Sequence, residues 1–326
     1  MTKVLITVDT ELSALLHKRG ASIQYNMDSS IWGKCREGRF GIEWQMDVLE
    51  AHGLKGVFFV DSLPGIIFRN GILPQIVKPI IDRGHEVQMH IHTEWVDWIV
   101  DSPTGSRRGR DLADYSLSDQ IVLLDLCAEM LENAGAPRPI AFRAGNYGAN
   151  DNSLRALAEI GLKWDSSFNA AYLGDSCHIS LPTDQLGAIE HCNVIELPVS
   201  DLHDSGTQIR PAQVCALSSA EMRAALLHSA KEQQDTFVIV SHSFEMLSRD
   251  RSRPNYAVMR RFEAMCDVIA KTPELVSAGF HDLDPAIALA PRKEQTRLGP
   301  NRLRTGLRMA EQAIATWLYE RQLRPV

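Results

Sequence analysis

Short, continuous runs of apolar and β-branched residues alternate along this chain with amphipathic stretches of helical periodicity, and this alternation limits most strongly how the chain can fold. Strands that are buried on both faces read as continuous apolar runs, and strands that alternate with helices indicate a parallel sheet. The sequence therefore predicts an α/β fold with a closed or open parallel sheet. The predicted strands span 4–8, 56–60, 86–90, 140–142, 194–197 and 237–240, and the predicted helices span 44–52, 75–83, 117–134, 152–160, 219–233 and 256–271.

Length and composition fit a soluble globular protein. The 326 residues are enough for two average domains or for one large α/β barrel. Apolar residues make up 44% of the chain and charged residues 23%, which is typical of a protein with a large core. The net charge of −7 argues against a nucleic-acid-binding surface. The longest apolar runs are too short to cross a bilayer, so no integral membrane segment is expected.

The cysteines and the first residues indicate a cytoplasmic protein. The cysteines are spread along the chain and form no Cys-x-x-Cys pair, as expected for reduced thiols in a core. The sequence begins directly with a predicted strand and shows no signal-peptide pattern. The six cysteines occupy positions 35, 127, 177, 192, 215 and 266.

Two carboxylates follow the first predicted strand. Asp9 and Glu11 flank Thr10 directly after the apolar run 4–8. The carboxyl ends of strands are where α/β proteins place catalytic and ligand-binding side chains. We therefore expect this acid pair to belong to a functional site.

A second polar group surrounds the end of the third predicted strand. Residues 84–95 contain three histidines and two glutamates, and imidazole together with carboxylate suits zinc or a similar divalent metal. If the strand continues, His90 and His92 point the same way; if a helical turn has begun, His90 and Glu94 share a face. Each alternative supplies a pair of metal ligands, and the sequence leaves both open.

Three further polar clusters fall at or just after predicted strands. Arg143, Asn146 and Tyr147 lie in the cluster 142–147, Asp165 lies in Trp-Asp-Ser-Ser at 164–167, and His242 lies in the cluster 240–245. Polar clusters that converge on one end of a barrel describe an active site.

Two other segments are candidates for the walls of such a site. Residues 12–43 form a long polar insertion after the first acid pair, and long loops at a catalytic end often act as lids or substrate walls. Trp95, at helical spacing from Trp98, is a candidate substrate-contacting wall residue or a core residue.

The composition changes after Leu283. The segment from Pro291 to Val326 is rich in arginine and carries an amphipathic pattern that includes Leu307, Ile314 and Trp317. We expect a helical appendage over 286–326 that packs against the main domain, 1–285, or against a second subunit, with its basic residues on a solvated face. A homo-oligomer formed through this helix is therefore one possible assembly.

The clusters resemble, in their order, the motifs of the polysaccharide deacetylase (NodB-homology) superfamily, carbohydrate esterase family four. The resemblance rests on Thr-Val-Asp-Thr at 7–10, Gly-Val-Phe-Phe-Val at 56–60, and Gly-His-Glu-Val at 84–87 with His90. Arg143, Asp165 and His242 resemble the third, fourth and fifth motifs. Together these motifs cover roughly residues 3–285 of the chain.

This resemblance implies a deformed (β/α) barrel with about seven parallel strands and hydrolysis of an N-acetyl or related amide. It implies a divalent metal, held by a carboxylate and two histidines, that activates a water molecule. Asp9 would be the general base and His242 the general acid. Arg143 would keep Asp9 ionised and oriented, and Asp165 would support the His242 imidazole.

The chain departs from the family pattern at three points. Thr10 stands where a second aspartate is usual, so the carboxylate ligand is Glu11 or Asp9 itself. Glu94 stands where the second histidine of the metal motif is usual, which gives a zinc site of Glu11, His90 and either His92 or Glu94. The third motif reads Arg-Ala-Gly-Asn-Tyr, so Asn146, Tyr147 or a nearby backbone N–H would contact the oxyanion.

The leading hypothesis is a metal-dependent hydrolase that removes an N-acetyl group from an intracellular saccharide or glycan precursor. A second hypothesis is a metal-independent hydrolase of a small cyclic imide or ureide, as in other branches of the superfamily. A third is a binding protein without catalytic activity on the same fold. Fold analogy alone does not decide between them.

Overall fold

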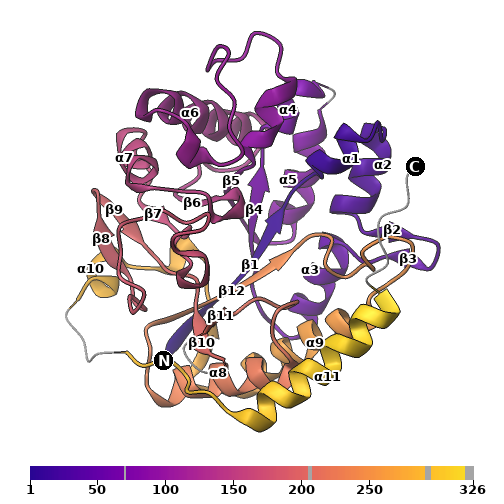
Figure 1. Cartoon of the computed structure of the whole chain (residues 1–326), viewed down its shortest axis with the longest axis vertical. Helices are drawn as coiled ribbons and strands as arrows, with labels where there is room; N and C mark the ends of the chain where they lie inside the picture. The colour runs from indigo at the N-terminus through magenta and orange to yellow at the C-terminus, as the bar shows by residue number, and fades with distance from the viewer. Residues whose placement is uncertain (70, 205–207, 291–294, 320–326) are drawn as a thin grey trace. The chain divides into compact units, whose positions relative to one another are not determined.

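The computed structural model describes residues 1–69, 71–204, 208–290 and 295–319 (Figure 1). These residues divide into two compact units. The first unit comprises 1–56, 200–278 and the segment from 295 onward, and the second comprises 57–199 and 279–294. The predicted domain boundary at 285 and 286 stays a prediction.

Parallel strands form the centre of the first unit. Strand β1 (Thr2–Thr10) lies between β12 (Thr236–His242) and β13 (Leu275–Ser277), and both neighbours run parallel to it. All residues of β1 except Lys3 are buried, which explains why its sequence is a continuous apolar run. Short antiparallel pairs join β2 (Lys34–Cys35) to β3 (Gly38–Arg39) and β10 (Asp201–His203) to β11 (Ile209–Pro211).

Helices cover these strands and close the core of the first unit. Val4, Ile6 and Ile239 pack with Leu226 of α8 and Phe262 of α9 in one apolar cluster. The helices of the unit are α1 (Ala14–Lys18), α2 (Ile23–Asn26), α3 (Ile42–Ala51), α8 (Ser219–Lys231), α9 (Tyr256–Lys271) and α11 (Arg302–Tyr319), with a π-helical turn at Met27–Ile31. The predicted insertion at 12–43 therefore holds short regular elements.

The second unit is also built on parallel strands. Strands β4, β5, β6, β7 and β9 follow one another in parallel, and β8 is antiparallel to β9. They span β4 (Val57–Asp61), β5 (Glu86–Ile91), β6 (Ala141–Ala144), β7 (Trp164–Asp165), β8 (Ile189–His191) and β9 (Val194–Glu196). The parallel strands and intervening helices of both units confirm the predicted α/β class.

Helices and short turns connect the strands of the second unit. Helix α5 begins three residues earlier than predicted and contains Pro79, whereas α6 follows its predicted bounds closely. The helices are α4 (Pro64–Ile67), α5 (Ile72–Asp82), α6 (Leu117–Asn133), α7 (Asp151–Glu159) and α10 (Pro285–Ala288), and the 3-10 turns are Thr93–Trp98, Leu112–Asp114, Gly145–Tyr147, Ala170–Tyr172 and Phe280–Asp282.

Helix α11 confirms the predicted C-terminal helix but not its expected orientation. Arg308 is buried, donates to both carboxylate oxygens of Asp204 at 2.8 Å and donates to Glu221 Oε1 at 3.0 Å. The apolar residues Leu307 and Trp317 are instead 58% and 79% exposed. Placing Arg308 on a solvated face was wrong because these two buried carboxylates compensate its charge.

Within the described residues, no helix has the length and apolar character that a membrane span requires.

Candidate active site

Asp9 and His242 occupy paired positions in the first unit. Strands β1 and β12 are in parallel register, with Asp9 opposite His242 at their carboxyl ends. The Nε2 atom of His242 lies 4.0 Å from Oδ2 of Asp9, and the Asp9 side chain is buried. A carboxylate and an imidazole at this separation can serve the same substrate as proton acceptor and proton donor.

Glu245 fixes the orientation of the His242 ring. Its Oε1 lies 2.7 Å from His242 Nδ1, and its other oxygen accepts from the Ser241 hydroxyl. Burial opposes the imidazolium, but the charge and hydrogen bond of Glu245, with smaller contributions from Asp9 and Glu11, raise the pKa of His242 to about 9. The ring is therefore protonated at neutral pH, as a general acid requires.

This contact corrects the role that the sequence suggested for Asp165. The carboxylate that holds His242 Nδ1 is Glu245, three residues further along the chain. Asp165 is fully buried in the second unit, where its oxygens accept from the backbone N–H and hydroxyl of Ser167. Burial raises the pKa values of Asp165 and neighbouring Glu196, and their mutual repulsion raises that of Glu196 further. Two adjacent buried carboxyl groups are most stable when they share a proton.

A cavity of about 740 Å³ opens beside His242 within the first unit. Phe244 and Arg251 line it together with residues of α11 such as Gln312. Arg251 lies over the Phe244 ring at 4.8 Å and donates to the Ser30 hydroxyl at 2.6 Å. Burial lowers the pKa of Arg251 to about 10, which leaves it charged at neutral pH. The volume lies in the range of small-ligand sites.

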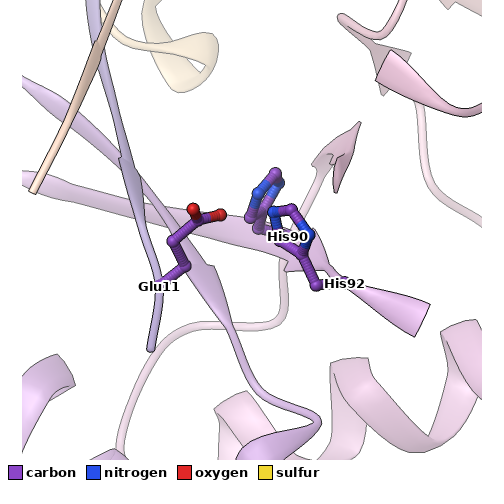
Figure 2. A group of neighbouring side chains, drawn as sticks. All are labelled: Glu11, His90 and His92. Carbon is purple, nitrogen blue, oxygen red and sulfur yellow. The ribbon is translucent and has the colours of Figure 1, made fainter. Parts of the chain in front are cut away.

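His90 and His92 form a pair at the end of β5 in the second unit. His90 is buried, and His92 follows the strand in an extended conformation, so the two side chains lie on one face. Their ring centroids are 5.0 Å apart with an interplanar angle of 76°. Figure 2 shows the two imidazoles of this pair and also labels Glu11, a residue of the first unit.

The Nδ1 atom of each imidazole has a partner on its own unit. His90 Nδ1 lies 2.7 Å from the Arg143 carbonyl oxygen, and His92 Nδ1 lies 2.9 Å from Glu94 Oε2. A carbonyl oxygen only accepts, so His90 donates from Nδ1, and Nε2 is the ring atom that a metal would bind. This is the arrangement in which protein histidines bind metals. It favours His92 over Glu94 as the second ligand and gives Glu94 the role of orienting His92.

Asn146 and Gly145 shape the surroundings of His92. Asn146 donates from its amide to Asp111 Oδ1 at 3.1 Å and to Glu94 Oε1 at 3.4 Å. Burial opposes ionisation of Glu94, but its contacts with His92 and Asn146 lower its pKa. A Cβ atom on Gly145 would lie 2.7 Å from both His92 Nδ1 and the Ile91 backbone oxygen, so a larger residue would displace the ring or the end of β5. Glycine at this position therefore allows the close approach of the two segments.

The remaining aromatic candidates are packed against other rings. Trp95 is fully buried, with its ring centroid 5.9 Å from that of Phe68 and 5.6 Å from that of Trp98. Trp95 therefore belongs to the core, where its side chain cannot contact substrate. Tyr147 is 9% exposed and packs on Tyr172 at 5.2 Å. The structure gives neither residue a geometry that favours direct recognition of substrate.

Arg143 is fully buried in the second unit. Its guanidinium donates to the backbone oxygen and the hydroxyl of Ser166 and lies 4.4 Å from the Phe59 ring centroid. Its backbone also supports His90, as described above. Arg143 therefore combines a buried positive charge with a fixed geometry.

Sequence reasoning assigned no role to Glu245, Glu196, Asp111 or Gly145. Glu245 lies within the cluster at 240–245 that contains His242, so its spacing carried a usable signal. The other three act on residues far away in the sequence, and no local pattern marks them.

No protein-family model and no curated protein matches the sequence. Among solved structures, a candidate polysaccharide deacetylase from Mycobacterium smegmatis aligns over 91% of this chain and 94% of its own, with 19% identity and a TM-score of 0.59. The fold is that of the polysaccharide deacetylases. This likeness confirms the predicted deformed (β/α) barrel.

Two further solved structures are similar to this chain. The 4-alpha-glucanotransferase from Thermococcus litoralis matches 92% of this chain and 41% of its own, with 9% identity and a TM-score of 0.53. A family 4 carbohydrate esterase from Streptomyces lividans matches 89% of this chain and 98% of its own, with 13% identity and a TM-score of 0.45. Because the glucanotransferase shares the fold, the activity of this chain has to be argued from its side chains.

Proposed function

We propose that this protein is a metal-dependent hydrolase of an amide C–N bond that removes N-acetyl groups from a saccharide. The observation that carries the proposal is the pair of imidazoles at His90 and His92, each with Nδ1 already held by an oxygen. Such fixed pairs supply metal ligands in hydrolases. The deacetylase-like fold of the mycobacterial protein supports the same reaction class.

Glu11, His90 and His92 would hold the metal. They offer one carboxylate oxygen and two imidazole nitrogens, and this donor set suits Zn²⁺. When bound, the ion would polarise the substrate carbonyl and lower the pKa of a coordinated water. Glu94 would fix the ring of His92 and keep its Nε2 directed to the ion.

Asp9 and His242 would transfer the protons. Asp9 would take the proton of the attacking water, and His242, protonated because Glu245 supports it, would give a proton to the departing nitrogen. As the sequence suggested, Arg143 would keep Asp9 ionised. We assign no direct proton transfer to Asp165; its role would be to fix the segment 165–167 that binds the Arg143 guanidinium.

The substrate would be an acetylated saccharide or glycan precursor in the cytoplasm. The cavity beside His242 combines an aromatic face at Phe244 with charged groups at Arg251 and Glu245, a mixture suited to an amphipathic sugar. All six cysteines are free thiols, which favours a reducing compartment.

An acetate-release screen on acetylated amino sugars, run beside elemental analysis of the purified protein, tests the proposal. Acetate release that requires stoichiometric divalent metal supports it. Activity of metal-free protein on a cyclic imide or ureide would instead identify the second hypothesis from the sequence. Absence of both metal and activity would leave a binding protein.

The exposed face of α11 would contact a second copy of the chain. Leu303, Leu307, Ile314 and Trp317 follow a heptad-like spacing, and each is at least 58% exposed. A helix pair around a two-fold axis would bury these residues on both copies. Sedimentation analysis should show a dimer that the Trp317→Glu substitution converts to monomer; an unchanged monomer in the wild type would exclude this interface.

A further inference from the structure

Three side chains of the second unit meet at the turn between β8 and β9, and no role proposed above uses them. Asp151 begins helix α7, His191 ends β8, and Cys192 is the first residue of the turn. Each offers one ligand atom, and the three atoms lie within 4.8 Å of one another. A carboxylate oxygen, an imidazole nitrogen and a thiol sulfur are the three side-chain donors that zinc prefers.

The distances already approach those of a bound metal. His191 Nε2 lies 3.0 Å from Asp151 Oδ1. Nitrogen and oxygen ligands at usual zinc bond lengths, with a tetrahedral angle between them, are about 3.3 Å apart. A metal could therefore replace the bridging proton with little movement of these two ligands, and the Cys192 sulfur, within 4.8 Å of both, would approach to complete the set.

The local backbone holds the three donors in place. Asp151 Oδ1 also accepts from the Ser180 N–H at 2.8 Å, which fixes the carboxylate at the start of α7. His191 and Val194 are paired across a two-residue turn in which Cys192 and Asn193 have φ values of 52° and 65°. Positive φ at both positions defines a type I′ turn, in which asparagine is favoured and cysteine carries a steric cost.

Exposure and charge are compatible with an ion from solution. The side chains of His191 and Asp151 are 25% and 23% exposed, so a cation can enter without unfolding. Burial raises the pKa of the Cys192 thiol, while Arg155 lowers it and Asp151 raises it. A metal would have to displace the thiol proton, so its affinity should increase with pH.

We propose that Asp151, His191 and Cys192 form a second metal site, specific for Zn²⁺ and similar borderline cations. Three protein ligands leave one tetrahedral position for water or another small ligand. The site shares no residue with the Glu11, His90 and His92 group. It therefore stands whether or not the protein is a deacetylase.

Cobalt titration of the full-length, metal-stripped protein tests this site directly. Co²⁺ substitutes for Zn²⁺ and gives a near-ultraviolet charge-transfer band only when a thiolate is a ligand. The proposed catalytic ligands include no cysteine, so the band reports this site alone. In the His90→Ala protein, which lacks a ligand of the other proposed site, we expect one equivalent of Co²⁺ per chain to saturate the band. Zn²⁺ should displace Co²⁺ because it ranks above Co²⁺ in affinity.

Substitutions of the three proposed ligands, compared with control substitutions elsewhere, test which residues bind Co²⁺. Cys192→Ser should remove the band, and His191→Ala and Asp151→Asn should each raise the Co²⁺ dissociation constant at least about tenfold. Cys35→Ser, at another partly buried cysteine, and His90→Ala should leave the band unchanged. In the His90→Ala protein Zn²⁺ should raise Tm, and adding Cys192→Ser should remove that increase.

No thiolate band in the wild type would overturn the site, as would a band that persists in Cys192→Ser. Unchanged affinity in both His191→Ala and Asp151→Asn would also contradict it. Circular dichroism of each variant confirms that the chain is folded before the titration.

Discussion

The proton-transfer pair of the first unit and the histidine pair of the second unit are positioned in different ways. Asp9 and His242 face each other because two strands are in register, and Glu245 supports His242 from three residues away. His90 is also placed by strand pairing, because it lies opposite Arg143 in the register of β5 and β6. His92 lies beyond the strand and depends on Glu94, which Asn146 contacts in turn. The first arrangement relies on strand pairing for both residues, whereas the second relies on strand pairing for His90 and on contacts after the strand for His92.

This difference has a consequence for function. Strand register is fixed along its whole length by backbone hydrogen bonds, so single side-chain changes should leave Asp9 and His242 in place. The position of the His92 ring depends on Glu94, on Asn146 and on the lack of a side chain at Gly145. Substitution of a residue that touches the ring only through one of these neighbours should therefore still move the ring. The proposed metal site should therefore tolerate substitution less well than the acid–base pair.

The largest effect is expected from His90→Ala. It removes a ligand held by the Arg143 carbonyl, so hydrolysis should be lost and the metal content should fall by one ion per chain while the fold remains. An ion bound by Asp151, His191 and Cys192 should stay. Metal content by elemental analysis, with circular dichroism as the fold control, measures this. Full metal occupancy in the variant would exclude His90 from the site.

The second prediction concerns Asp9→Asn. The amide keeps the shape of the side chain but cannot take a proton, so turnover should fall by roughly a hundred-fold or more. Metal content should remain at the wild-type level, because the proposed carboxylate ligand is Glu11. Near-normal turnover on the true substrate would refute the role of Asp9 as base.

Glu94→Gln and Gly145→Ala sharpen the comparison. Each disturbs the His92 ring without removing a proposed ligand, so the metal dissociation constant should rise by about ten- to a hundred-fold. Gly53→Ala is a matched control, since a Cβ there meets no other atom, although its positive φ is strained. Competition against a chelator measures the affinity. Wild-type affinity in both variants would show that His92 is not a ligand.

The smallest effect is expected from Glu245→Gln, and it should appear on the basic limb of the pH profile. The wild-type His242 pKa of about 9 places the basic limb of kcat/KM near that pH, because activity needs the imidazolium. Without the Glu245 charge, only the smaller contributions of Asp9 and Glu11 oppose burial, so the His242 pKa should fall. Activity at pH 8 should then decrease by roughly tenfold, with little change at pH 6. An unmoved basic limb would contradict the pairing.

The same rise in the His242 pKa should make the folding stability depend on pH. A histidine pKa raised on folding contributes stability that is present below the unfolded value of about 6.5 and is lost as pH rises through about 9. Tm of the wild type should therefore exceed that of Glu245→Gln at pH 6 and approach it above pH 9. Denaturation scans across this range measure the difference.

The amino-acid sequence by itself determined the elements and the location of the polar clusters. The apolar run around Val4–Val8 became the buried strand β1, and the helical pattern at 256–271 became α9 with the same bounds. Both follow from local periodicity, which depends only on neighbouring residues. The order of the motifs also sufficed to predict the deacetylase-like barrel.

The tertiary structure alone decided which groups act on each other. Glu245, rather than Asp165, holds His242; Glu94 orients His92; and Trp95 is in the core. Arg308 is buried against two carboxylates, whereas the helical pattern suggested a solvated charge. A hydrogen bond or ion pair requires its partners within about 3 Å, and that separation depends on how distant segments pack, which no local pattern encodes.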